Sequence, residues 1–374
     1  MSLKSSFVSY LNQKYPDLKA EQIDPLISEQ LLSPFQISLT YAQVEQIKSE
    51  IEAYWQLRAW GEANLQADFE KHGLRRPSNY AACMSYDFHI NSAGKTELIE
   101  INTNASFLAL GLELLSFLKL PNVAGEFNDT DLAAMFKNEI SAAAGRTEAS
   151  VAIIDEQPEQ QRLYLEFLVY QSLLRRHGLK TDILDITAAD QFENYSLIYN
   201  RYTDFYLQEE KSKRIRSLYN EKKIELSPQP YDYFLLADKQ RLIDWNRQKD
   251  VPLPTSLLKI YDLAHEEKDF IWQERKHLFF KPKNSFGGKQ AYKGASLSRK
   301  VFDEVFNENF VAQQFSAPST VEVQMNNEAV SFKYDLRCFA YQNKLQLIVA
   351  RLYQGQTTNL KTPGGGFAAV RIVN

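Results

Sequence analysis

Residues 279–294 read FFKPKNSFGGKQAYKG, in which two phenylalanines and a Lys-Pro pair run into a glycine pair and further lysines. The apolar start predicts a strand that carries Lys281 to a loop containing Gly287 and Gly288. Glycines let backbone N–H groups approach an anion closely, and ammonium groups add positive charge. The GxxxxGK[ST] spacing of the Walker loop is absent. The stretch therefore favours a phosphate-holding loop, with a surface turn as the alternative.

Composition narrows the classes of partner. The chain has 374 residues, 44% of them hydrophobic and 13% aromatic, which is enough for two or three lobes with large cores. A net charge of −4 gives no electrostatic support for binding nucleic acid or an anionic membrane. We therefore expect neither nucleic acid nor membrane as a partner.

Two further features bear on localisation. The segment before Pro16 lacks a continuous apolar run, and no stretch approaches the ~20 apolar residues of a membrane-spanning helix. Cys83 and Cys338 lie in apolar surroundings, which predicts buried free thiols in a reducing compartment. We therefore expect a soluble, cytoplasmic protein.

The hydrophobic pattern predicts helices in the first part of the chain and strands next. Residues 1–75 read as helical, with Thr40 as the N-cap of an apolar repeat at helical spacing. Residues 82–104 predict a hairpin, because CMSYDFHI and KTELIEIN are joined by the turn residues Asn-Ser-Ala-Gly. The following FLALGLELLSFL predicts a buried helix.

From Ser150 onward the elements alternate. VAIID and KTDILDI predict strands on either side of a helix at 166–177, and SLIYNR predicts another strand. This order is typical of an α/β lobe. Short helices are predicted at 238–246 and 299–307, with strands over most of 279–373.

Polar side chains gather on one face of the predicted hairpin. In LIEIN, Leu98, Glu100 and Asn102 share a face because strand side chains alternate with period two. If the strands pair directly across the four-residue turn, Asp87 lies opposite Leu98 and projects to the same side. Two carboxylates and an amide oxygen are hard ligands that suit Mg²⁺. The face is therefore a candidate metal site, or alternatively a solvated hairpin surface.

The C-terminal third carries further polar elements. FVAQQFSAP predicts a strand leaving through a hinge, where backbone groups and Gln313 would read an adenine edge. KYDLRCFAY places Arg337 on one strand, and LIVARLYQGQTTNLKTPGGGF places Arg351 on another before a glycine-rich loop. Arginines on adjacent strands suit phosphoryl or carboxylate oxygens, which a guanidinium binds bidentately. Surface salt bridges are the alternative.

Taken in order, these motifs resemble the ATP-grasp superfamily, and most closely its glutathione synthetase-like branch. That pattern has a Lys-Pro strand, a glycine-rich loop, an MAQ-aromatic-x-P hinge, a D-x-R strand and an A-R-x-x-Q-G segment before a glycine-ended loop. This chain has FFKPKNSFGG, VAQQFSAP, DLR and ARLYQGQTTNLKTPGGG in the same order. The resemblance implies an α/β ATP-grasp fold, in which two α+β lobes enclose ATP beside a Rossmann-like lobe.

One element lies out of order. The family ends with an aspartate strand and an E-x-N strand, whereas here YDFHINSAGKTELIEINTNAS lies at 86–106. The resemblance, which covers about 86–374, therefore implies a circular permutation. The proline often found after E-x-N is absent. The expected regions are a helical N-terminal region at 1–80, the permuted metal-binding hairpin and helix at 81–148, the Rossmann-like lobe at 149–237, and the nucleotide-binding lobes at 238–374.

The resemblance also implies roles for individual residues. Contacts to ATP are implied for Lys239, Lys281, Lys283, Ser285, Gly287, Gly288, Gln313 and Gln314. Ligation of Mg²⁺ is implied for Asp87, Glu100 and Asn102. A catalytic role, in which they steady the transferred phosphoryl group or the substrate carboxylate, is implied for Arg337 and Arg351. Substrate contacts are implied for Asn104, Arg201 and Asn359.

The implied reaction is an ATP- and Mg²⁺-dependent ligation. A small-molecule or peptide carboxylate would become an acylphosphate, from which an amine or a thiol displaces phosphate. Positioning and charge neutralisation suffice, so no protein nucleophile is needed. The alternatives are a kinase that phosphorylates a small molecule on the same scaffold and a non-catalytic nucleotide-binding protein. The sequence leaves a homodimer open.

Overall fold

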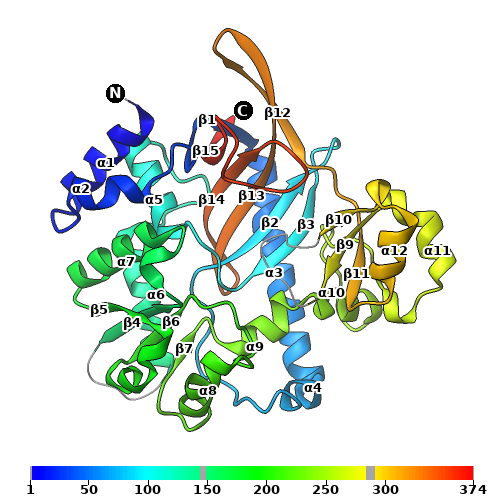
Figure 1. Cartoon of the computed structure of the whole chain (residues 1–374), viewed down its shortest axis with the longest axis horizontal. Coiled ribbons are helices and arrows are strands. Elements are labelled where there is room, and N and C mark those ends of the chain that lie inside the picture. The colour runs from blue at the N-terminus through cyan, green and yellow to red at the C-terminus, as the bar shows by residue number, and fades with distance from the viewer. Residues whose placement is uncertain (1, 144–148, 284–290, 374) are drawn as a thin grey trace.

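The computed structural model describes residues 2–143, 149–283 and 291–373 and has a mixed α/β architecture (Figure 1). A seven-stranded sheet lies at the centre, and two four-stranded sheets belong to separate lobes. In Figure 1 the smaller of these lobes lies to the right of the central sheet and the other lies below and to the left. The expected α/β fold class is confirmed.

The central sheet joins segments from both ends of the chain. Its strand order is β1-β15-β14-β13-β2-β3, with β12 also paired to β13. The strands are β1 (Leu32–Thr40), β2 (Met84–Ile90), β3 (Thr96–Asn102), β12 (Ser319–Met325), β13 (Glu328–Tyr341), β14 (Lys344–Tyr353) and β15 (Gly366–Val373). Pairing is antiparallel except between β1 and β15. The β2–β3 hairpin thus lies beside β13, the strand that carries the D-x-R motif.

Strand β1 corrects the expectation that residues 1–75 are helical. Ile37 and Leu39 are buried and alternate with exposed Ser38 and Thr40, which is the period of a strand. This run is short, and its partner β15 lies at the other end of the sequence, so local pattern alone does not reveal it. The helix α3 (Tyr41–Asn64) then begins as predicted, with a capping box at Thr40.

The small lobe, defined here as residues 260–314, is built on an antiparallel sheet with helices on one face (Figure 1). Its strands in spatial order are β10 (Tyr292–Lys293), β9 (Leu278–Pro282), β11 (Phe310–Gln314) and β8 (Ile260–Asp262). Its helices are α11 (Lys268–Glu274) and α12 (Arg299–Phe306). Phe280 and Phe302 meet edge to face in its core.

The second lobe has a fully parallel sheet, as expected from the alternating elements. Its strands in spatial order are β5 (Lys180–Asp185), β4 (Ser150–Asp155), β6 (Leu197–Asn200) and β7 (Leu226–Ser227). The helices of this part of the chain are α6 (Asp129–Ala142), α7 (Tyr164–Arg176) and α8 (Lys213–Asn220).

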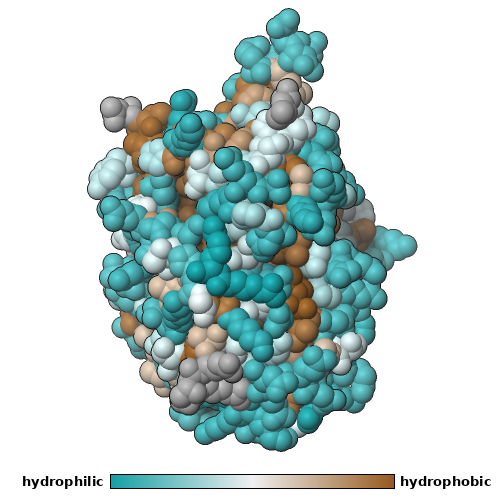
Figure 2. Space-filling model, turned by 90° about the vertical axis from the view of Figure 1, so that its left-hand side faces the viewer, coloured by the Kyte–Doolittle hydropathy of each residue, from teal (hydrophilic) through white to brown (hydrophobic). Residues whose placement is uncertain are grey.

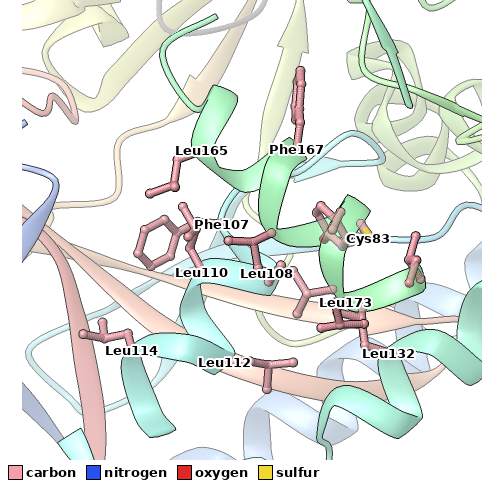
Figure 3. Close-up of a cluster of buried hydrophobic side chains, with 14 of the residues drawn as sticks. Cys83, Phe107, Leu108, Leu110, Leu112, Leu114, Leu132, Leu165, Phe167 and Leu173 are labelled. Atoms are coloured by element: carbon pink, nitrogen blue, oxygen red, sulfur yellow. Dashed lines mark hydrogen bonds between the residues drawn. The ribbon is translucent and has the colours of Figure 1, made fainter. Parts of the chain in front are cut away.

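The other α-helices of the described residues lie in several parts of the chain. They are α1 (Leu3–Lys14), α2 (Ala20–Ile23), α4 (Gln66–Glu70), α5 (Leu108–Leu118), α9 (Pro230–Asp232) and α10 (Lys239–Arg247). Helix α5 is the leucine-rich helix predicted from the sequence, and its side chains pack against those of α7 (Figure 3). Phe107 precedes it and stacks on Phe367 of β15, with ring centroids 3.5 Å apart. A Cβ at Gly111 would lie 2.7 Å from Leu347, so glycine permits the close approach of α5 to β14.

The β12–β13 hairpin extends beyond the central sheet. In Figure 2 it projects from the top of the molecule with a hydrophilic tip. The tip residues Asn326, Asn327 and Glu328 are exposed, whereas Phe332 is buried against Phe35. One face of the hairpin therefore packs on the sheet while its tip stays in solvent.

The structure also bears on the cysteines and on membrane-spanning helices. Cys83 and Cys338 are both free and buried, which confirms the expectation of buried thiols. Within the described residues, no helix combines the length and the apolarity needed to cross a membrane.

Candidate active site

A cavity of about 370 Å³ lies between the central sheet, the small lobe and the loop after β14. What we call its small-lobe half is lined by side chains of the small lobe and of the chain directly beside it, namely Leu258, Phe279, Lys281, Pro282, Gln314 and Phe315. Those that we call its loop half are Arg162, Leu163, Tyr353, Thr357 and Leu360. The predicted site residues that line it are Glu100, Lys239, Lys281, Gln313, Gln314, Arg337, Arg351 and Asn359.

Lys281 is the buried cation of the small-lobe half. Its ammonium donates to Gln313 Oε1 at 2.8 Å and to the Ile99 carbonyl oxygen at 2.9 Å. Both acceptors are neutral, and among the described residues Lys281 forms no ion pair. Burial lowers the pKa of Lys281 to about 8; Glu100 opposes this shift and Lys239 adds to it. Lys281 is therefore a cation near its titration point, in contact with the cavity.

The other two predicted lysines differ in their surroundings. Lys239 lines the cavity at the start of α10, and burial lowers its pKa while Glu100 opposes the shift. Lys283 is absent from the cavity lining, and its ammonium lies 2.9 Å from Asp262 Oδ1 and 3.0 Å from Gln240 Oε1. Lys239 thus lies in the cavity, whereas Lys283 lies outside its lining and forms an ion pair with Asp262.

The hairpin brings Asp87, Glu100 and Asn102 together. Asn102 Nδ2 donates to Asp87 Oδ2 and to Glu100 Oε1, each at 3.3 Å. The expected register is wrong, because Asp87 pairs with Glu100 rather than with Leu98. The register shifts at Ile99, which has no partner on β2 and whose carbonyl accepts from the lysine of β9.

Asp87 is the centre of a buried charge cluster. It is fully buried and accepts from Arg337 Nε at 3.1 Å, Arg337 Nη2 at 2.8 Å and Arg351 Nη2 at 2.8 Å. Burial raises the pKa of Asp87, but the two guanidinium groups outweigh it and lower the pKa to about 2. Both carboxylate oxygens of Asp87 are thus occupied by arginine in this structure.

Arg351 continues the cluster towards the loop after β14. It donates from Nε and Nη2 to the two oxygens of Asp335, at 2.7 and 3.0 Å. Thr358 Oγ1 of that loop donates to Asp335 Oδ2 at 2.7 Å. The two predicted arginines therefore lie on adjacent strands, as expected, and both bond to Asp87, which the sequence did not indicate.

The two predicted glutamines face different surroundings. Gln313 is 2% exposed, and its amide is engaged with Lys281 and, at 3.4 Å, with the Leu98 carbonyl oxygen. Gln314 is exposed and lines the small-lobe half. The segment after β11 contacts the central sheet at Ser316. The carbonyl oxygen and the hydroxyl of Ser316 lie 3.2 and 3.1 Å from Nδ1 of His89 on β2.

The predicted substrate residues Asn104 and Arg201 bond to each other and do not line the cavity. The Arg201 guanidinium is buried and also donates to the Ala105 carbonyl and to Ser106 Oγ. Ser106 does line the cavity, and its carbonyl accepts from Arg337 at 3.4 Å. Arg201 thus holds the segment between β3 and α5 in place.

Asn359, the third predicted substrate residue, shapes the loop after β14. Its Nδ2 donates to the Gln354 carbonyl at 2.8 Å, and its Oδ1 accepts from Lys361 N and Thr362 Oγ1, each at 3.0 Å. These bonds fold the loop on itself. Asn359 therefore lines the cavity, and its side-chain amide also stabilises the loop to which it belongs.

Three predicted residues, Ser285, Gly287 and Gly288, lie outside the described residues. The ATP contacts implied for these three residues therefore stay predictions. Within the described residues, no group of three or more His, Cys, Asp or Glu side chains is arranged to hold a metal ion.

Sequence reasoning missed several residues of the cavity. The D-x-R pattern assigns no role to Asp335, although this carboxylate accepts hydrogen bonds from both Arg351 and Thr358. Arg162 and Leu163 come from the parallel-sheet lobe and carry no motif. Only the folded chain brings them to the loop half, so periodicity and spacing gave no signal for them.

Comparison with known proteins gives similarity in solved structures alone. No family model matches the sequence, and the search of curated proteins found no match. A protein from Methylobacillus flagellatus KT, provisionally described as a gamma-glutamylcysteine synthetase, is similar over 86% of each chain, with 11% identity and a TM-score of 0.45.

The ATP-grasp ligase PsnB is also similar. Its complex with a minimal precursor, Mg and ADP covers 60% of this chain and 89% of that chain, at 9% identity and a TM-score of 0.31. Its complex with the precursor peptide PsnA2 and AMPPNP covers 61% and 89%, at 10% identity and a TM-score of 0.30. Similarities at this level carry no information on activity. The function is therefore argued below from the residues of the cavity.

Proposed function

We propose that this protein is an ATP- and Mg²⁺-dependent carboxylate–amine ligase of the ATP-grasp type, which forms a C–N bond through an acylphosphate. The observation that carries the proposal is the buried Lys281 ammonium, which lines the cavity and bonds to two neutral oxygens. A buried cation without an ion-pair partner is costly, and an anion in the cavity would add the missing contact. The phosphates of ATP meet this requirement.

The small-lobe half suits the base of a nucleotide. Leu258, Phe279 and Phe315 give it apolar walls, and apolar walls with a few polar groups are typical of cofactor sites. Gln314 is exposed in the same half, so we assign its amide to the base edge in place of Gln313, which holds Lys281.

The oxygen donors of Glu100 and Asn102 fit Mg²⁺. Glu100 lines the cavity and acts electrostatically on both Lys239 and Lys281, and Asn102 contacts Glu100. These two residues would hold the ion against the phosphates. Asp87, the third expected ligand, would join them only by giving up a guanidinium contact.

When bound, MgATP supplies the phosphoryl group that activates the substrate. A carboxylate oxygen of the substrate takes the γ-phosphoryl group and ADP leaves, which gives an acylphosphate. An amine nitrogen then attacks the carbonyl carbon, the C–O bond to phosphate breaks, and inorganic phosphate leaves with the proton that the amine gives up. Lys281, Arg337 and Arg351 would offset the charge on the phosphoryl oxygens during these steps.

The same proposal includes the circular permutation. What supports it is the position of the β2–β3 hairpin, which pairs with β13 so that Asp87 lies opposite Arg337. A strand pair that ends the domain in the family would thus form one edge of the central sheet here while lying early in the sequence. The proposal also includes the cytoplasmic location and the small-molecule or peptide substrates.

A nucleotide-turnover screen tests the function. Purified protein with MgATP is incubated with pools of small carboxylates and amines, while ADP and inorganic phosphate are measured separately. A ligase releases both in equal amounts and requires a carboxylate together with an amine. Release of ADP without phosphate would instead indicate a kinase.

Variants make the screen specific to the site. Glu100→Gln removes one charge from the proposed ion site and is expected to abolish turnover. Glu97→Gln makes the same change on the same strand outside the cavity lining, where Glu97 bonds to Asn91, and should retain turnover. Absence of MgATP binding in the parent protein, or full turnover in Glu100→Gln, would refute the assignment.

A further inference from the structure

Arg162 stands on a rigid turn at the edge of the loop half. The turn follows the short helix η2 (Pro158–Gln160), and Gln161 N donates to the Pro158 carbonyl at 3.1 Å. Gln161 Nε2 donates to the Glu156 carbonyl at 2.6 Å, and Tyr164 N donates to the Gln161 carbonyl at 3.0 Å as α7 begins. The backbone that carries Arg162 is therefore fixed on both sides.

The side chain of Arg162 makes few contacts, in contrast to the hydrogen-bonded backbone around it. It is exposed and lines the cavity, and its one hydrogen bond among the described residues runs from Nη2 to the Leu360 carbonyl at 2.8 Å. Arg337 is paired with Asp87, and Arg351 with Asp87 and Asp335. Among the described residues Arg162 forms no ion pair, so it is the arginine of this cavity whose charge is uncompensated.

The position of Arg162 determines which substrate it would meet. A carboxylate awaiting phosphorylation must lie near Lys281 and Glu100, because the phosphates are assigned there. The second substrate then occupies the loop half, where Leu163 and Leu360 line the cavity together with Arg162. A guanidinium with free donors at the exposed edge suits a carboxylate on the part of that substrate remote from its amine.

We infer that Arg162 is a specificity residue for the amine substrate, and that this substrate is an amino acid or short peptide whose free carboxylate it binds. The inference rests on the proposed function for the identity of the two substrates. Arg162 would exchange its bond to Leu360 for a bidentate pair with the carboxylate. Because Leu360 belongs to the loop after β14, the same exchange would link substrate binding to that loop.

Equilibrium binding tests the inference without any turnover. The twenty standard L-amino acids and their carboxamides serve as probes, and their dissociation constants for the parent, Arg162→Gln and Arg162→Lys are measured by ligand-observed NMR. Arg175→Gln is the matched control, because Arg175 is an arginine of the same lobe that lies on α7 outside the cavity lining. The same titrations are repeated with MgATP present.

In the parent and in Arg175→Gln, at least one amino acid should bind about tenfold or more tightly than its carboxamide. Arg162→Gln should reduce this preference to within about twofold, and Arg162→Lys should restore part of it. A preference that survives in Arg162→Gln, or no preference for any free amino acid in the parent, would overturn the inference. Failure of the proposed function would show separately, as missing MgATP binding or turnover in the parent.

Discussion

Raising the pH from 7 to 9 is expected to weaken nucleotide binding about tenfold, because Lys281 loses the proton that attracts the phosphates. Burial lowers the pKa of this lysine to about 8, well below that of a lysine in water. A bound polyphosphate stabilises the ammonium and raises its pKa again. Binding must therefore include uptake of a proton whenever the free protein has lost it.

The size of the effect follows from the pKa alone. If only the ammonium form binds well, the affinity falls by about twofold at pH 8 and about tenfold at pH 9, relative to pH 6. About half a proton should be taken up per nucleotide at pH 8. Lys281→Met removes the titrating group but keeps an apolar chain of similar length, so its affinity should be weak already at pH 7 and nearly independent of pH up to 9.

Isothermal calorimetry checks both quantities. Titrating ATP in two buffers of different ionisation enthalpy gives the number of protons taken up, and subtracting the Lys281→Met result removes the ionisation of the nucleotide itself. Lys300→Met, an exposed change on α12 of the same lobe, is the matched control and should behave as the parent. Parallel loss of affinity with pH in the parent and in Lys281→Met would refute the reasoning.

The remaining predictions concern metal, pH and packing. Glu100→Gln should abolish the dependence of ATP affinity on Mg²⁺ in calorimetric titrations with and without the ion; an unchanged dependence would exclude Glu100 as a ligand. Burial raises the pKa of Glu139 to about 8, so its contribution to folding is complete below pH 4.5 and is lost as the pH rises through 8. Glu139→Gln should therefore flatten the fall in unfolding free energy between pH 5 and 8 measured in urea, and an identical slope in both proteins would contradict this. Phe107→Ala, which removes the ring stacked on Phe367, should cost about 3–5 kcal/mol in urea unfolding at pH 7, and a loss below about 1 kcal/mol would be at odds with the packing described.

The sequence allowed much of the local structure to be predicted. The N-cap at Thr40, the hairpin around Gly94, the helix α5 and the strand carrying Lys281 all depend on neighbouring residues, and all are present. The two arginines of the D-x-R and A-R strands lie close together for the same reason, because each strand places its arginine on a definite face.

Features that depend on residues far apart in the sequence could not be predicted. Strand β1 needs β15, and the register of the hairpin depends on Ile99, whose carbonyl bonds to Lys281 from another lobe. The same lysine bonds to the amide oxygen of Gln313, a contact that no local pattern indicates. The hydrogen bond from Arg201 to the Ala105 carbonyl likewise joins residues about a hundred positions apart.

The early position of the β2–β3 hairpin has a consequence for synthesis of the chain. Its neighbour in the sheet, β13, emerges from the ribosome only after a further ~230 residues, which takes roughly 10–50 s at typical elongation rates. Strand β1 waits still longer for β15. Until then both present unpaired strand edges, so the nascent chain should depend on protection from aggregation, whereas the lobe built on β4–β7 is already complete.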